Sequence, residues 1–305
     1  MSDFREPVKR RKLCQPANVR HLGADTSADL SQLRSLLFAP GSDQGKLVKA
    51  FASEADAVIA DLEDAVAPAE KTAARELVLH ILGATVKRRR PLTMLRVNGA
   101  DTALFRADLA VAEQLELDAL VLPKATPQAV AALGPEGPPV IAIIETANGI
   151  RQAYETARNP RVAALVLGAA DLGAETGLEP RADGLEILYA RSKLVVDSVA
   201  AGIRPPFDVV HLDTRDDEGL EAECQLARSL GLRGKACIHP AQVHVVNRIF
   251  APTRDELEWA QRVVEAYEEG KRGGRGAVAL DGAMIDLPVV ARAQRILAEA
   301  KGASA

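Results

Sequence analysis

The chain has 305 residues, 48% of them hydrophobic, and its 38 Lys and Arg residues against 42 Asp and Glu residues give a formal net charge of -4. This length and composition suffice for one large domain with appendages. A slightly acidic chain offers no overall attraction to nucleic acid, so we expect no nucleic-acid partner. The longest apolar runs, at 140–144 and 162–167, fall far short of the roughly 20 residues that cross a membrane, so no membrane partner is expected either.

The termini and the cysteines bear on location. Cys14, Cys224 and Cys237 are odd in number and lack metal-type spacing, which favours a reducing compartment, the cytoplasm. The basic run at 9–12 is not followed by an apolar segment, so residues 1–30 are interpreted as a flexible arm rather than a secretory signal. A short charge run is more often solvated surface than a binding site.

From residue 34 onward, short β-rich apolar runs alternate with longer segments of helical apolar spacing, as in a parallel sheet covered by helices. The strands are expected at 35–39, 57–62, 93–97, 119–122, 140–144, 163–167, 209–212 and 236–238. The helices are expected at 44–51, 69–82, 104–115, 127–133, 149–157, 186–201, 218–230 and 242–250. Eight such pairs predict an α/β fold, a (β/α)8 TIM barrel over residues 31–250, with a doubly wound open sheet as the alternative.

Residues 251–305 depart from the alternation. A charged amphipathic helix near 255–269 precedes a glycine-rich linker, KRGGRG at 271–276, and a last apolar segment at 277–300. We interpret this tail as a C-terminal helical lid that packs on its own barrel or reaches a neighbour.

Active sites of such barrels lie at the carboxyl ends of the strands, where this chain places many charged side chains. The polar residues expected there are Asp61, Glu63, Asp64, Arg96, Lys124, Glu145, Asp171, Asp213 and His239. Clustered carboxylates repel one another unless a cation compensates, and oxygen donors favour Mg²⁺, with Mn²⁺ as a possible substitute. Glu145 and Asp171, on successive strands before glycine-containing turns, are the predicted metal ligands; the alternative is that they cap the following helices.

Two further rim residues have competing interpretations. Arg96 can grip a substrate carboxylate in a bidentate fork, or form an ion pair with Asp61 or Glu63. His239 fits substrate contact and structural hydrogen bonding equally well. No GxSxG, Walker A or Rossmann glycine motif is present in the sequence, which disfavours a serine hydrolase, an NTPase or an NAD-dependent enzyme.

Seven blocks of the chain together resemble the HpcH/HpaI aldolase and citrate lyase β-subunit superfamily, in its CoA-lyase-like branch. They are RSLLFAPG (34–41), DLEDAVAPAEKTAAR (61–75), RVNG (96–99), LPK (122–124), IIET (143–146), GAADLGAETG (168–177) and GKACIHPAQ (234–242). In addition, GAMIDLP at 282–288 resembles the lid segment of this family. Ala170 is a departure, because relatives often carry an acidic residue there.

The resemblance implies a role for each matching residue. Glu145 and Asp171 would ligate Mg²⁺, Arg96 would hold the substrate carboxylate, and Glu63 with Asp64 would orient water or neighbouring groups. The residues implied to contact the CoA thioester or the substrate are Arg34, Lys71, Arg75 and Pro240. Asp286, in the lid segment, would complete the active site of a neighbouring subunit in a homo-oligomer, a trimer or hexamer; without the resemblance, an Asp before Leu-Pro is a helix-start signal.

The expected activity is a magnesium-dependent carbon–carbon lyase that cleaves a malyl-CoA- or citramalyl-CoA-type thioester to acetyl-CoA and a small 2-oxo acid. Three alternatives remain: a citrate lyase β-subunit-like protein acting on an acyl-carrier thioester, a malyl-CoA thioesterase or malate synthase-like enzyme, and a metal-binding scaffold without turnover.

Overall fold

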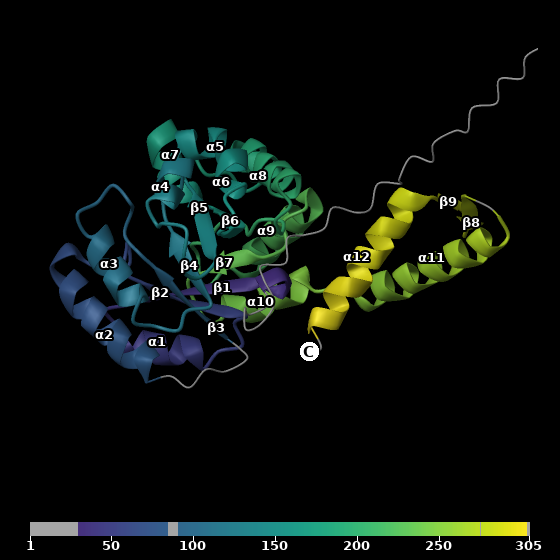
Figure 1. Ribbon diagram of the computed structural model, residues 1–305. Coiled ribbons are helices and arrows are strands. Elements are labelled where there is room, and N and C mark those ends of the chain that lie inside the picture. The colour runs from purple at the N-terminus through teal and green to yellow at the C-terminus, as the bar shows by residue number, and fades with distance from the viewer. Residues whose placement is uncertain (1–29, 85–90, 275, 304–305) are drawn as a thin grey trace, which may run out of the picture.

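The computed structural model describes residues 30–84, 91–274 and 276–303. They form a barrel of parallel strands covered by helices, from which a helical extension projects (Figure 1). The predicted arm at residues 1–30 lies outside the described residues except for Leu30, which begins a short 3-10 helix, η1 (Leu30–Gln32). Among the described residues, no helix is long and apolar enough to cross a membrane.

Seven parallel strands make up the barrel, paired in the order β6-β5-β4-β3-β2-β1-β7. The strands are β1 (Ser35–Pro40), β2 (Ala57–Asp61), β3 (Leu92–Arg96), β4 (Ala119–Leu122), β5 (Val140–Ile144), β6 (Val162–Leu167) and β7 (Lys235–Cys237). The helices around them are α1 (Gln44–Phe51), η2 (Pro68–Glu70), α2 (Lys71–Gly83), α3 (Phe105–Ala112), α4 (Pro127–Ala131), α5 (Ala147–Arg151), α6 (Ala153–Ala157), α7 (Ala169–Thr176), η3 (Leu185–Ile187), α8 (Leu188–Ala201), α9 (Asp217–Leu230) and α10 (Gln242–Phe250). The predicted TIM-type barrel is therefore confirmed, and the open sheet is not observed.

The predicted strand at 209–212 is wrong. The ring closes two residues earlier, where Phe207 bridges Val166 of β6 and Asp208 bridges Lys235 of β7. The β-branched residues that suggested a strand pack through their side chains without pairing in a ladder: Val209 is buried in the outer cluster, and Val210 is partly buried against the barrel interior. Two residues thus take the place of the eighth strand.

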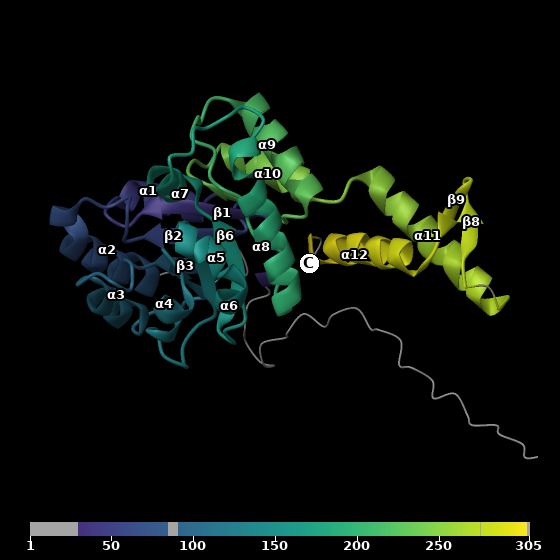
Figure 2. The ribbon, with the colours of Figure 1, turned by 90° about the horizontal axis from the view of Figure 1, so that it is seen from above.

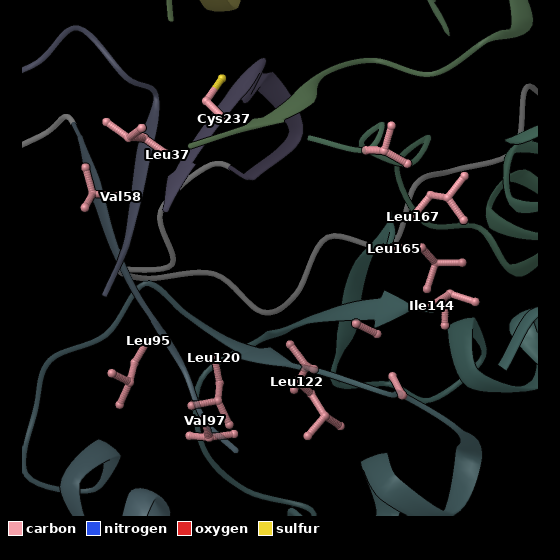
Figure 3. Packing of buried hydrophobic residues seen from close by; sticks show 14 of the residues in the cluster. Leu37, Val58, Leu95, Val97, Leu120, Leu122, Ile144, Leu165, Leu167 and Cys237 are labelled. Atoms are coloured by element: carbon pink, nitrogen blue, oxygen red, sulfur yellow. The ribbon is translucent and has the colours of Figure 1, made fainter. Parts of the chain in front are cut away.

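The strands bury both of their faces because successive side chains point to opposite sides. One set packs outward against the helices and includes Leu37, Val58, Leu95 and Leu165 (Figure 3). The alternate set fills the barrel and includes Leu36, Ile59, Met94, Val121, Ile141 and Val166. The barrel is therefore a filled core, and chemistry is confined to its rim.

The extension is a pair of packed helices with a small hairpin at the end away from the barrel (Figures 1 and 2). It comprises α11 (Arg254–Arg272), β8 (Val278–Leu280), β9 (Ala283–Ile285) and α12 (Leu287–Ala303). Thr253 and Glu256 form a capping box that starts α11, which takes in the first two residues of the predicted linker, Lys271 and Arg272, and is followed by its C-cap, Gly273. Tyr267 and Ile296 belong to a core that the extension keeps for itself.

Three local features differ from the sequence prediction. The helix expected at 149–157 is two short helices, α5 and α6, interrupted at Gln152. Helix α7, in the loop after β6, and the β8–β9 hairpin were not predicted. The last residues of α12 return toward the barrel, where Arg233 Nε lies 3.1 Å from Glu299 Oε1.

Candidate active site

Asp61 and Arg96 lie side by side at the carboxyl end of the barrel, because they end neighbouring strands in the same register. Ile59 and Met94, two residues earlier, point into the barrel, so the period of two directs Asp61 and Arg96 inward as well. Arg96 donates from Nε to Asp61 Oδ1 at 2.7 Å and from Nη2 to Asp61 Oδ2 at 2.6 Å. The guanidinium also lies over the ring of Phe38, 4.9 Å from its centroid.

Arg96 also faces two carboxylates on the loop after β2. Its Nη1 is 2.8 Å from Glu63 Oε2 and 3.7 Å from Asp64 Oδ2. Burial lowers the pKa of the Arg96 guanidinium, but Asp61, Glu63 and Asp64 outweigh this and raise it, so the group stays charged. The alternative interpretation of Arg96, an ion pair with Asp61 or Glu63, is therefore observed with both partners.

Burial is the main influence on Glu63, whose pKa is raised to about 8. Arg96 opposes this shift, and the neighbouring carboxylates Asp64, Glu145 and Asp61 add to it. Both its burial and the neighbouring negative charges therefore disfavour the ionised form of Glu63.

Glu145 follows β5 and points toward the same rim. Burial raises its pKa to about 7; the backbone N–H of Lys124 opposes the shift and Asp171 adds to it. That N–H donates to Glu145 Oε1 at 2.7 Å. A Cβ at Gly168 would lie 2.6 Å from Glu145 Oε2, so a glycine is required beside this carboxylate. The helix-cap alternative does not apply to Glu145, because the side chain that caps α5 is that of Thr146.

Asp171 lies in the first turn of α7. The Lys124 ammonium is 3.7 Å from Asp171 Oδ1 and 3.9 Å from Glu63 Oε1. Burial lowers the pKa of Lys124, but Asp171, Glu63 and the other rim carboxylates raise it by more. The Lys124 ammonium therefore lies between two carboxylates from different loops, Glu63 after β2 and Asp171 after β6.

The donor set fits a hard divalent cation. Five carboxylates, from Asp61, Glu63, Asp64, Glu145 and Asp171, share the rim with the cations Arg96 and Lys124, which leaves an excess of negative charge and two glutamates with raised pKa values. Among the described residues, no group of three or more His, Cys, Asp or Glu side chains is arranged to hold a metal. A pair of carboxylates is nevertheless enough for Mg²⁺, which takes water and substrate oxygens as its other ligands.

Three predicted substrate-binding residues bind groups other than the side chains of the carboxylate cluster. Arg34 precedes β1 and pairs with Asp56, which precedes β2, so it lies at the opposite, amino end of the barrel and does not join the site. Lys71 is buried and donates to the backbone carbonyls of Leu62 and Glu63 at 2.7 and 2.6 Å. Arg75 binds Asp108 through Nε at 2.6 Å. Lys71 therefore supports the loop that carries Glu63, whereas Arg75 joins α2 to α3.

Pro240 and His239 follow β7 at the carboxyl end of the barrel and are exposed. His239 Nδ1 accepts a hydrogen bond from Ala241 N at 3.2 Å, which matches the structural interpretation of this histidine. Asp213 is also exposed and accepts from Arg215 N at 2.9 Å. No contact of these three residues with the carboxylate cluster is seen among the described residues.

Asp286 joins β9 to α12 and so belongs to the extension that projects from the barrel (Figures 1 and 2). Its Oδ1 accepts from Val289 N at 3.3 Å and its carbonyl from Val290 N at 3.0 Å. The helix-start interpretation of Asp286 is therefore observed, and within one chain the residue is not brought to the rim.

Sequence reasoning passed over two residues that shape the site. Lys124 was placed at the end of a strand but given no role, although LPK lies between two predicted strands and its lysine faces the same edge. Gly168 precedes Asp171 in GAADLGAETG, and its need for space beside Glu145 is visible only in three dimensions.

A parallel barrel with acidic side chains at the carboxyl ends of its strands defines the class of (β/α)8 enzymes. Residues 34–240 match the model of the HpcH/HpaI aldolase/citrate lyase family. The chain belongs to this family, as the seven sequence blocks indicated.

Named relatives and solved structures agree with this assignment. A (3S)-malyl-CoA thioesterase of Cereibacter sphaeroides is 40% identical over 276 residues, covering 89% of this chain and 96% of the relative. The citrate lyase subunit beta of Leuconostoc mesenteroides is 37% identical over 279 residues, covering 87% and 92%. The crystal structure of CitE from Mycobacterium tuberculosis with magnesium, acetoacetate and coenzyme A has a TM-score of 0.77 and 36% identity, covering 89% of this chain and 99% of CitE. These relatives are enzymes, so the expectation of an enzyme of this lyase family is confirmed.

Proposed function

We propose that this protein is a magnesium-dependent carbon–carbon lyase that cleaves a malyl-CoA- or citramalyl-CoA-type thioester to acetyl-CoA and a 2-oxo acid. The observation that carries the proposal is the rim cluster, in which Glu145, Asp171 and Glu63 all have Lys124 as a neighbour. Glu63 also pairs with Arg96. The complex of CitE with magnesium, acetoacetate and coenzyme A supports it, because a metal, a small oxo acid and CoA occupy a related protein together.

In this proposal Glu145 and Asp171 hold Mg²⁺, or Mn²⁺ in its place. When bound, the cation would supply Lewis acidity, which lowers the pKa of the substrate hydroxyl. Arg96 offers its remaining N–H groups to the substrate carboxylate and fixes its orientation while Asp61 holds the guanidinium in place. Glu63 and Asp64 orient water and neighbouring groups around the site.

The bond that breaks joins the carbinol carbon to the methylene carbon beside the thioester. The hydroxyl gives its proton to a water that Glu63 and Asp64 orient and becomes the new carbonyl of the 2-oxo acid, and the electron pair of the broken bond passes to the thioester enolate. That enolate takes a proton to give acetyl-CoA. We assign this proton to the Asp286 carboxyl of a neighbouring subunit, since Asp286 lies in the projecting extension and caps α12 rather than facing the rim of its own barrel.

This assignment requires a homo-oligomer, which we propose to be a trimer or hexamer. It also gives the projecting extension a role as a lid for another copy. We further propose a cytoplasmic location, to which the free, buried thiols of Cys224 and Cys237 add support.

A thioesterase is the second candidate, because the (3S)-malyl-CoA thioesterase relative covers nearly the whole chain. Product analysis separates the two. With Mg²⁺ and malyl-CoA, a lyase yields acetyl-CoA and glyoxylate, whereas a thioesterase yields free CoA and malate. The absence of both product pairs with malyl-CoA and with citramalyl-CoA would contradict the proposal and direct attention to acyl-carrier thioesters.

A further inference from the structure

Lys124 has an unusual backbone for a residue with a side chain. Its φ is 47°, in the left-handed region, a conformation shared by one other non-glycine residue, Asp281, among the described positive-φ positions. Such a conformation is costly for residues other than glycine and persists only where the surroundings impose it. At this position, the backbone N–H of Lys124 is directed to Glu145 Oε1 at 2.7 Å.

The side chain of Lys124 reaches the other proposed metal ligand. Its ammonium is 3.7 Å from Asp171 Oδ1 and 3.9 Å from Glu63 Oε1. The Lys124 side chain is 42% exposed, against 11% for Arg96, so it is the more accessible of the two cations. One residue therefore contacts Glu145 through its main chain and Asp171 through its side chain.

We propose that Lys124 is a positioning residue that keeps the magnesium affinity of the free enzyme low and makes it depend on the anionic substrate. The inference rests on the proposed function, in which Glu145 and Asp171 hold the cation. The ammonium and a divalent cation compete for the same Asp171 carboxylate, and like charges at this separation repel. A substrate carboxylate adds negative charge between them, which relieves the repulsion and strengthens metal binding.

The test compares Lys124→Met with the wild-type chain. Methionine has a similar length, carries no charge and meets the same backbone strain, and its N–H can still reach Glu145. In calorimetric Mg²⁺ titrations without substrate, the variant should bind about tenfold more tightly, a value reduced from the bare Coulomb energy because the side chain is partly exposed. Lys124→Arg keeps the charge and should bind as the wild type does.

A second titration adds saturating pyruvate, a 2-oxo acid with one carboxylate. Pyruvate should strengthen Mg²⁺ binding in the wild type and much less in Lys124→Met, a difference that a merely structural residue would not produce. The proposal is overturned if Lys124→Met binds Mg²⁺ no more tightly than the wild type, or if pyruvate strengthens binding equally in both.

Glu145→Ala separates this outcome from failure of the metal assignment. If Glu145→Ala titrates like the wild type, the metal does not use Glu145, and the proposed function fails in that respect whatever Lys124→Met shows. If Glu145→Ala loses binding while Lys124→Met is unchanged, only the role of Lys124 fails. Circular dichroism confirms that each variant is folded.

Discussion

Replacing Asp208 with asparagine should destabilise the barrel far more than a change of one atom suggests. Asp208 is fully buried and accepts from Arg191 at 2.8 and 3.0 Å and from Lys235 at 2.9 Å. Without its charge, Lys235 would keep Glu223, 2.8 Å away, and the buried Arg191 would lose the carboxylate with which it pairs. Removing one partner of a buried ion pair typically costs about 3–5 kcal/mol of unfolding free energy, because it leaves an uncompensated buried charge.

Glu258→Gln is the matched control, since it makes the same change of carboxylate to amide in an ion pair at the surface. Glu258 is 2.7 Å from Arg254, and both side chains are more than half exposed. Such a pair, four residues apart on a helix, contributes about 0.3–0.5 kcal/mol. Urea denaturation followed by circular dichroism measures both variants, and equal losses for Asp208→Asn and Glu258→Gln would refute the reasoning.

The pH dependence of the same pair gives an independent check. Burial raises the pKa of Asp208, but Lys235 and Arg191 outweigh it and hold the pKa below its ordinary value. The stability that Asp208 contributes is therefore present above the unfolded pKa of about 3.9 and is lost as the pH falls through the folded pKa. The difference between wild type and Asp208→Asn should be constant near neutral pH and shrink below about pH 4; a constant difference throughout the acid range would contradict the charge argument.

Three further predictions concern the proposed site and the thiols. Glu145→Ala should weaken Mg²⁺ binding at least about 100-fold and abolish turnover while the circular dichroism spectrum is unchanged; unchanged affinity would remove Glu145 from the metal site. Asp286→Ala should slow turnover about 10²- to 10⁴-fold while Mg²⁺ binding is retained. Mixing it with inactive Glu145→Ala chains should restore activity, and a mixture that exchanges subunits yet stays inactive would place Asp286 outside a neighbour's site. Burial raises the pKa of Cys224 and Cys237 to about 12, so iodoacetamide at pH 8 should modify neither thiol until urea unfolds the chain, as mass spectrometry can show.

Much of the barrel could be predicted from the sequence because its strands are buried on both faces. Such strands read as nearly continuous apolar runs between turns, and most of them were found at or within a few residues of their observed bounds. The closing segment could not be found in this way. A two-residue pairing at Phe207 and Asp208 is too short for any periodic pattern, and a buried Asp paired with a buried Lys looks like surface sequence.

The hairpin in the extension could have been predicted from the sequence. Asp281 and Gly282 both adopt positive φ, at 51° and 79°, between strands β8 and β9. Asp-Gly between two apolar runs is a strong indicator of a two-residue hairpin turn. The interpretation as a linker followed by an apolar segment ignored this dipeptide.

The candidate site was predictable where it depends on strand ends and not where it depends on side-chain direction. Arg96, Glu145 and Glu63 end or follow strands, so the parallel register brings them to one edge. Arg34 precedes its strand, and that position alone places it at the other end of the barrel, although the family resemblance suggested a substrate contact. The left-handed backbone of Lys124 has no counterpart in the sequence, because lysine is not a residue that favours it.

The extension keeps its own apolar core, in which Val263 and Tyr267 of α11 pack with Ile285, Val290 and Ile296. The match to the family model stops at residue 240, before this unit begins. A segment that buries its apolar side chains within itself can be lengthened, shortened or exchanged between related genes without repacking the barrel. Recombination at the junction near Ala251 and Pro252 would therefore give evolution, or a protein engineer, a way to exchange the extension while the barrel stays intact.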